Sequence, residues 1–184
     1  MHHEIIIAGY GGQGILLMGR LLAHAGMLGE KNVTCFPSYG AEIRGGTANC
    51  TVVVSEEAIA SPLSAHPDVL IAMNEASMRR FEGRIKSGGL IFINSSLVKS
   101  APERTDIEII DLPASELAAK IGNSKTSNIV MLGAFIEKTA IITVENTLDA
   151  LREMLPDGKE SLFNINREAL FVGTEWTKKG KGWG

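Results

Sequence analysis

The chain has 184 residues, of which 45% are hydrophobic and 21% are charged, values typical of a single globular domain and not of a disordered segment. Its formal net charge of −3, from 18 Lys and Arg against 21 Asp and Glu, argues against nucleic acid as the main partner, because phosphate binding needs a basic surface. Its 2 cysteines, Cys35 and Cys50, are too few for a disulfide framework or for an iron–sulfur site with four thiolates.

The chain also carries no recognisable membrane or export signal. No apolar run approaches the roughly 20 residues that a bilayer span needs. The N-terminus leads from Met1 into a strand-like run without the basic, apolar and cleavage regions of a signal peptide. We therefore expect a cytoplasmic protein without a membrane partner, and we interpret both cysteines as small core residues.

The first half of the chain alternates predicted strands and helices. Short β-branched runs predict strands, and longer runs rich in Leu, Met and Ala predict helices that end at glycine. Pro37 is expected to end the second strand. The strands are expected at Glu4–Gly9, Asn32–Phe36, Thr47–Ser55, Asp68–Met73, Leu90–Asn94 and Asp106–Asp111, and the helices at Ile15–Leu28 and Asn74–Lys86.

The second half is predicted to be helical. Its helices are expected at Pro113–Ile121, Asn128–Ala140, Thr143–Leu155 and Glu160–Phe171. The last residues alternate Lys with Gly, a composition that usually frays, although a docking tail for a partner is the alternative. We therefore predict a single α/β domain over residues 1–173 and a basic Gly/Lys tail over 174–184.

This order of elements predicts an α/β fold, a three-layer sandwich with a mixed, mostly parallel central sheet and a Rossmann-like first βαβ unit. The segment Ser38–Gly46 is too short to hold a crossover helix. The strand that follows it, Thr47–Ser55, is therefore expected to run antiparallel to its neighbour.

A glycine-rich turn links the first strand to the first helix. Gly9–Gly14 fits the pattern G-x-G-x-x-G, and the helix that follows offers unpaired N–H donors and a partial positive charge. The turn predicts an anion cradle; a tight turn that binds nothing is the alternative. A bound NAD is disfavoured, because the second strand ends in Cys35-Phe36-Pro37 without the carboxylate that bonds the ribose.

A second loop, Pro37–Gly46, is expected at the same carboxyl edge of the sheet. It places Tyr39, Glu42 and Arg44 in an otherwise apolar part of the chain. The planar fork of Arg44 suits a carboxylate or phosphate, although an internal ion pair with Glu42 explains the pattern equally well.

No catalytic or metal-binding constellation accompanies these two segments. The sequence lacks a P-loop, zinc-ligand spacing and a nucleophile–base pair, and His24 is interpreted as structural. The candidate residues for cofactor binding or subunit contact are Gly9, Gly11, Gly12, Gln13, Gly14, Ser38, Tyr39, Glu42, Arg44, Gly45 and Gly46.

The two segments Gly9–Gly14 and Pro37–Cys50 together resemble the signatures of the gamma subunit of 2-oxoacid:ferredoxin oxidoreductases, a family with pyruvate, ketoisovalerate and 2-oxoglutarate members. Equivalent domains are fused into single-chain pyruvate:ferredoxin oxidoreductases. The likeness continues through Asp68–Asn74 and Asn128 to about residue 170.

The resemblance implies an accessory subunit of a complex that decarboxylates a 2-oxoacid, forms an acyl-coenzyme A and passes electrons to ferredoxin. Thiamine diphosphate and 4Fe–4S clusters are then expected on partner subunits, namely alpha, beta and a ferredoxin-like delta chain. Coenzyme A is a possible ligand of a site shared with them. The alternatives are a free-standing nucleotide-binding module or NAD(P)-dependent oxidoreductase, and a purely structural interface protein.

Overall fold

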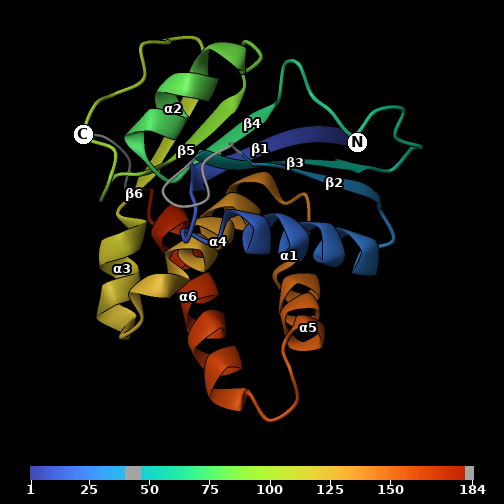
Figure 1. Ribbon diagram of the computed structural model, residues 1–184, viewed down its shortest axis with the longest axis vertical. Helices are drawn as coiled ribbons and strands as arrows, with labels where there is room; N and C mark the ends of the chain where they lie inside the picture. Colours follow the sequence, from blue (N-terminus) through green and yellow to red (C-terminus); the bar gives the residue numbers. More distant parts are fainter. Residues whose placement is uncertain (40–46, 181–184) are drawn as a thin grey trace.

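Six strands of the chain pair into one sheet with helices on both faces, as the computed structural model shows for residues 1–39 and 47–180 (Figure 1). The strands are β1 (His2–Tyr10), β2 (Asn32–Tyr39), β3 (Thr47–Ser55), β4 (Val69–Ala72), β5 (Leu90–Asn94) and β6 (Glu108–Leu112). The α-helices are α1 (Ile15–Leu28), α2 (Glu75–Phe81), α3 (Ala114–Ile121), α4 (Ser127–Thr139), α5 (Val144–Met154) and α6 (Glu160–Lys178). Two short 3-10 helices are η1 (Glu82–Arg84) and η2 (Ser124–Thr126).

The sheet is mixed, as predicted. Its strand order is β2-β3-β1-β4-β5-β6, and the four consecutive strands β1, β4, β5 and β6 run parallel to one another. Strand β3 runs antiparallel to both β1 and β2, which confirms the prediction made from the short segment before it. Because β3 lies between β1 and β2, the first βαβ unit does not form the adjacent strand pair of a dinucleotide-binding fold.

The register places the ends of β1 and β2 at one edge of the sheet. Tyr10 of β1 pairs with Thr47, and Tyr39 of β2 pairs with Ala48, the next residue of β3. Strand β4 ends at the same edge, since Ala72 pairs with Ala8 of β1. The carboxyl edge, the side of the sheet where β1, β2 and β4 end, therefore holds both the glycine turn after β1 and the last residues of β2.

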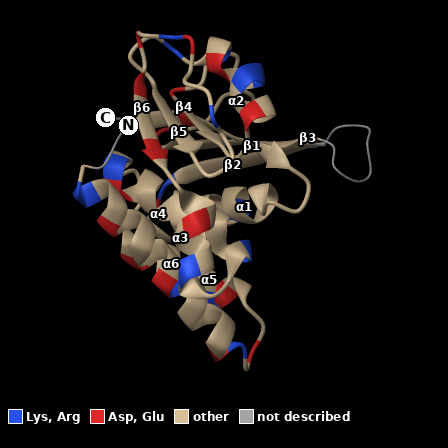
Figure 2. Cartoon of the chain, turned by 90° about the vertical axis from the view of Figure 1, so that its left-hand side faces the viewer, with Lys and Arg blue, Asp and Glu red and all other residues tan. Residues whose placement is uncertain are grey.

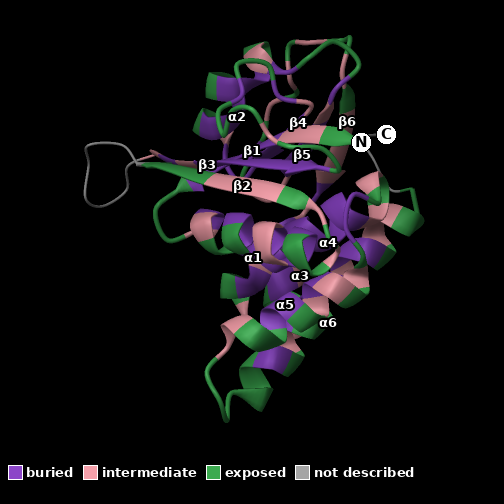
Figure 3. Ribbon diagram, turned by 90° about the vertical axis from the view of Figure 1, so that its right-hand side faces the viewer, coloured by how far each residue is buried: buried purple, intermediate pink, exposed green. Residues whose placement is uncertain are grey.

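Two apolar clusters lie on the two faces of the sheet. Ile5 and Ile7 of β1 pack toward α1, α4 and α6, whereas Ile6 and Ala8 pack toward α2, as the two-residue period of a strand requires. Figure 3 shows α4 coloured as buried between the sheet and α6. The Phe135 ring of α4 meets Phe92 of β5 edge-on, with 5.7 Å between ring centroids.

Most predicted boundaries lie within two residues of the observed ones, and three differ by more, at the C-terminal ends of β2, α2 and α6. Strand β2 continues through Pro37 to Tyr39, because β2 is an edge strand, where a missing N–H is tolerated. Helix α2 ends at Phe81 and η1 follows it, in place of one helix to Lys86.

Helix α6 extends past Phe171 to Lys178, so residues 174–178, assigned to the tail by composition, are helical. The reason is burial: Thr174 is 2% exposed, and the Trp176 ring packs against the main core. The remaining tail residues 181–184 lie outside the described residues. Within the described part of the chain, no helix is long and apolar enough to cross a membrane.

Candidate functional site

The glycine turn closes on itself through backbone and side-chain hydrogen bonds. The Gln13 backbone N–H donates to the Tyr10 carbonyl oxygen at 3.1 Å, and the Gln13 side-chain oxygen accepts from the Tyr10 N–H at 2.7 Å. Gly12 and Gly14 have φ angles of +95° and +73°, a region that glycine adopts far more easily than other residues. The turn therefore depends on glycine for its backbone shape.

Two of the glycines are needed for close packing. A Cβ on Gly9 would lie 2.6 Å from the Ile15 side chain, and a Cβ on Gly14 would overlap the Asn128 amide. Asn128, near the start of α4, is only 1% exposed, and its Nδ2 donates to the Gly14 carbonyl at 3.2 Å. Gly9 and Gly14 are therefore packed closely against neighbouring side chains, and the binding role of the turn stays a prediction.

The Gln13 side chain joins the turn to the end of β4. Its Nε2 donates to the Met73 carbonyl at 3.2 Å, and its Oε1 accepts from Asn74 Nδ2 at 2.8 Å. The Asn74 side-chain oxygen in turn accepts from the Ser77 N–H at 2.9 Å and caps α2. The Gln13 amide is therefore occupied within the protein, and it holds the glycine turn against the N-terminus of α2.

The other two glycines lie at the surface just before α1. Gly11 and Gly12 are exposed, and a Cβ on Gly12 would meet no atom within 4 Å. No side chain of the described residues caps the α1 N-terminus, and its first turn contains no acidic residue. The unpaired N–H groups and the helix dipole favour an anionic group at this end of α1.

A basic side chain lies at the same edge. Arg80 of α2 is exposed, and its Nη1 donates to Oγ1 of Thr47, the first residue of β3, at 3.0 Å. Its guanidinium also lies over the Phe81 ring, 5.3 Å from the centroid. In Figure 2, α2 carries basic residues (blue) and lies on the face of the sheet opposite α1. Because Thr47 pairs with Tyr10, Arg80 places a positive charge at the carboxyl edge, on the α2 face of the sheet.

The acidic residue at the start of α2 is engaged elsewhere. Glu75 accepts hydrogen bonds from the Ser100 hydroxyl and from the Lys99 N–H, the latter at 2.9 Å. These bonds hold the pKa of the Glu75 carboxyl below its usual value, the Ser100 bond having the largest effect. Glu75 thus organises the segment after β5 and remains negatively charged at neutral pH.

The second predicted loop is only partly described. Ser38 is exposed at the end of β2, and Tyr39 is the last residue of that strand. Glu42, Arg44, Gly45 and Gly46 lie outside the described residues. The sheet register brings Ser38 and Tyr39 to the edge that carries the glycine turn, as expected.

Three residues of this site were not among the sequence candidates: Asn74, Arg80 and Asn128. Asn74 had a detectable signal, since an Asn after a buried strand and before a helix is a typical N-cap. Asn128 also had a signal, since it lies in the part of the chain that extends the family resemblance. Arg80 had none, because its partner Thr47 lies far from it in the sequence.

The described residues show no arrangement suited to a metal ion. No group of three or more His, Cys, Asp or Glu among them is arranged to hold a metal ion. The 2 cysteines of the chain do not fit a 4Fe–4S cluster, which takes four thiolates. His24, interpreted as structural, lies with its Nε2 2.6 Å from a Glu153 carboxylate oxygen and links α1 to α5.

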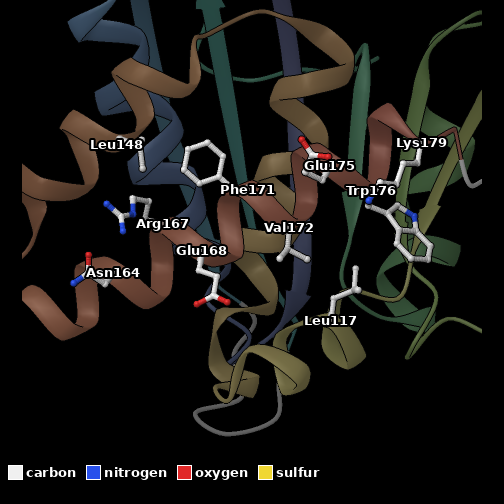
Figure 4. A pocket seen from close by; sticks show the side chains of 10 residues that line it. All are labelled: Leu117, Leu148, Asn164, Arg167, Glu168, Phe171, Val172, Glu175, Trp176 and Lys179. Carbon is white, nitrogen blue, oxygen red and sulfur yellow. The ribbon is translucent and has the colours of Figure 1, made fainter.

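A separate apolar groove of about 900 Å³ runs along α6, on the side of the sheet that α1, α4 and α6 cover (Figure 4). Phe171, Val172 and Trp176 of α6 line it together with Leu117 of α3 and Leu148 of α5. No residue of the glycine turn lines this groove, so the two features are distinct surfaces of the chain.

Comparison with known proteins places this geometry in a family. The family model described as pyruvate ferredoxin/flavodoxin oxidoreductase matches residues 4–176. The chain is 35% identical over 177 residues to the ketoisovalerate oxidoreductase subunit VorA of Methanothermobacter marburgensis, a match that covers 96% of this chain and 37% of VorA. The chain thus spans little more than a third of the length of that relative.

Two solved structures are similar over nearly the whole chain. The gamma subunit of a keto/oxoacid ferredoxin oxidoreductase from Geobacter sulfurreducens superposes with a TM-score of 0.84 at 27% identity, covering 96% of this chain and 99% of that one. The 2-oxoglutarate:ferredoxin oxidoreductase from Magnetococcus marinus, solved with 2-oxoglutarate, coenzyme A and succinyl-CoA, superposes with a TM-score of 0.88 at 26% identity. That match covers 97% of this chain and 31% of the other. The chain therefore belongs to the pyruvate ferredoxin/flavodoxin oxidoreductase family.

Proposed function

We propose that this chain is the gamma-type component of a 2-oxoacid:ferredoxin oxidoreductase and that its carboxyl edge contributes to a coenzyme A site shared with partner subunits. The observation that carries the proposal is the uncapped N-terminus of α1, preceded by the exposed Gly11 and Gly12, with Arg80 at the same carboxyl edge of the sheet. The family match and the coenzyme A present in the Magnetococcus marinus structure support it.

The residues at this edge fit the phosphate groups of coenzyme A. Backbone N–H groups at the start of α1 are donors for phosphate oxygens, and the exposed Arg80 guanidinium is a fork that matches phosphate geometry. A Cβ at Gly12 would meet open space, so a ligand has room to approach the backbone there. Bound coenzyme A supplies the thiol that accepts the acyl group, while this chain binds and orients its anionic part.

The remaining chemistry belongs to partners in this proposal. Thiamine diphosphate and the 4Fe–4S clusters reside on the alpha, beta and delta subunits, and ferredoxin accepts the electrons of the complex. The 2-oxoacid is selected by the subunits that carry thiamine diphosphate, in keeping with matches to both ketoisovalerate and 2-oxoglutarate enzymes. We place the complex in the cytoplasm.

The test compares Arg80→Gln with Arg79→Gln in the assembled complex. Loss of one charge-assisted phosphate contact is worth about 1.5–3 kcal/mol, so we expect the KM for coenzyme A to rise about tenfold or more in Arg80→Gln. The KM for the 2-oxoacid should stay unchanged. Steady-state kinetics with ferredoxin or an artificial acceptor provides the measurement.

Arg79→Gln is the matched control, because it removes the same charge from the adjacent position. The Arg79 side chain instead lies near two carboxylates: its Nη1 is 3.3 Å from a Glu82 oxygen and 3.4 Å from a Glu103 oxygen. An equal effect of both variants on the KM for coenzyme A, or no effect of Arg80→Gln in an intact complex, would contradict the proposed site.

Arg44 provides a second test of the same site. Its role as a ligand of coenzyme A rests on the sequence and stays a prediction. Arg44→Ala should raise the KM for coenzyme A in the assembled enzyme. An unchanged KM with intact assembly would assign Arg44 to protein contacts only.

A further inference from the structure

Both cysteines of the chain lie side by side on neighbouring strands. Cys35 of β2 pairs in register with Val52, and Cys50 of β3 pairs with Pro37, so the two cysteines are diagonal neighbours on the same face of the sheet. Their Sγ atoms are 3.2 Å apart. A small closure of this distance brings two thiols to bonding distance, since an S–S bond measures about 2.05 Å.

The two thiols differ in how accessible they are. Cys50 is fully buried beneath α1, where a Cβ on Gly19 would lie 2.7 Å from its Sγ. Cys35 is half-buried on the edge strand β2, which has no neighbouring strand on its outer side among the described residues. A small oxidant therefore reaches Cys35 first, and Cys50 is held directly behind it.

We propose that Cys35 and Cys50 form a reversible redox pair, in which Cys35 is the reactive thiol toward peroxide and Cys50 is the resolving thiol that closes an intrachain disulfide. The proposal rests on the position of the two sulfurs and is independent of the proposed coenzyme A site. The bond would tie the edge strand β2 to β3.

The chemistry balances with peroxide as the oxidant. The Cys35 thiolate attacks one peroxide oxygen, the O–O bond breaks, and hydroxide leaves to give a sulfenic acid. The Cys50 sulfur then attacks Cys35 Sγ, the S–S bond forms, and the sulfenic oxygen leaves as water with the proton from Cys50. The two thiols together lose two electrons and two protons, and one peroxide becomes two waters.

Hydrogen bonding within the pair supports these roles. The hydrogen bond with Cys50 lowers the pKa of Cys35 to about 7, and Arg20 of α1 acts in the same direction. The same bond, together with burial, raises the pKa of Cys50. Cys35 is therefore the thiolate of the pair at neutral pH, and thiolates are the reactive form.

The test uses the reduced full chain, titrated with hydrogen peroxide and analysed by thiol counting in denaturant and intact mass. The chain has 2 cysteines, so any intrachain disulfide must join Cys35 to Cys50. We expect loss of both thiols, a mass decrease of about 2 Da from the two lost hydrogens, a monomer on a non-reducing gel, and reversal by dithiothreitol. Retention of both thiols, or a disulfide between chains, would overturn the proposal.

The variants Cys50→Ser and Cys35→Ser assign the order of events. Peroxide should leave a sulfenic acid at Cys35 in Cys50→Ser, trapped as a dimedone adduct, and dimedone should not label Cys35→Ser. If dimedone labels the wild-type chain as strongly as Cys50→Ser, Cys50 does not resolve the intermediate and the proposal fails. The thiol count on the wild-type chain needs neither variant to fold.

Discussion

Individual glycines of this chain serve different purposes, and the atoms around each one show which. Gly14 combines a φ of +73° with direct contact to the buried Asn128 amide. Gly12 has a φ of +95° but open space where a Cβ would be. Gly83, in η1, has neither constraint. Substitution by alanine at each of the three positions therefore separates the cost of backbone strain from the cost of steric overlap.

We expect Gly14→Ala to destabilise the fold by about 2–3 kcal/mol, because it adds steric overlap to the strain of a left-handed backbone. Gly12→Ala should cost about 1–2 kcal/mol from backbone strain alone. Urea unfolding monitored by circular dichroism measures both free energies of unfolding. Gly83→Ala is the control and should change stability by less than about 0.5 kcal/mol; an equal loss at Gly12 and Gly14 would refute the packing role of Gly14.

The reactivity of Cys35 should depend on pH in the neutral range. Its pKa is lowered to about 7, so its thiolate fraction rises from a minority at pH 6 to a majority at pH 8. Alkylation of the native chain by iodoacetamide should therefore follow an apparent pKa of about 7 and label Cys35 before Cys50. Peptide mapping by mass spectrometry identifies the site. A rate that keeps rising to pH 9 without a plateau would show that the pKa of Cys35 is not lowered.

Among the helices, α4 and α6 make the tightest contact, and it depends on two glycines. A Cβ on Gly173 of α6 would overlap the Val130 carbonyl oxygen, and a Cβ on Gly133 of α4 would overlap the Leu170 carbonyl. The residues of α4 from 128 to 136 are all buried, so this helix has no free side toward which it can shift. The close approach of the two backbones fixes α6 against the core.

Gly173→Ala should therefore destabilise the chain by about 3 kcal/mol or more, the upper end for overpacking, because the new methyl group meets backbone and not a flexible side chain. Thermal unfolding followed by circular dichroism gives the comparison with the Gly83→Ala control. A melting temperature within a few degrees of the wild type would mean that α6 moves away from α4 at little cost.

The edge strand β2 continues past a proline in its sequence. Pro37 pairs in register with Cys50, although its ring supplies no N–H to the ladder. Within residues 1–39 and 47–180, no strand pairs with the outer side of β2, so the missing donor costs no sheet hydrogen bond when it points outward. Pro37 also interrupts the row of backbone N–H groups through which this edge strand would otherwise pair with another chain.

For the molecule as a whole, the C-terminal boundary of the folded unit lies further along the chain than composition indicates. Trp176 packs against the main core, and its Nε1 donates to the Asp111 carbonyl at 3.2 Å. Helix α6 thereby connects the helical layer to β6, the strand at the far edge from β2. Residues 174–178 belong to the fold and not to a free tail.

A chain that ends after Gly173 should lose about 3–5 kcal/mol of stability relative to a chain that ends after Gly180, comparable to removal of a buried Trp side chain. Chemical unfolding of the two truncated chains measures the difference directly. Equal midpoints would show that residues 174–180 contribute nothing to stability and would restore the tail boundary predicted from composition.

Local patterns were sufficient for most of the fold. The bounds of α1, β3 and β5 agree with the sequence predictions, because apolar periodicity and terminating glycines act within one element. The antiparallel direction of β3 followed from a segment too short for a crossover. The predicted binding role of the glycine turn stays a prediction, although the turn itself lies where the pattern places it.

The sequence by itself determined the order of strands and helices, the glycine turn and the family, because each depends on residues close together in the chain. Only the tertiary structure decided that Arg80 meets Thr47, that Asn128 supports Gly14, and that the two cysteine sulfurs touch. These contacts depend on strand order and helix packing, which no local periodicity encodes. Helix α6 extends to Lys178 for the same reason: a distant core surface buries its last turns.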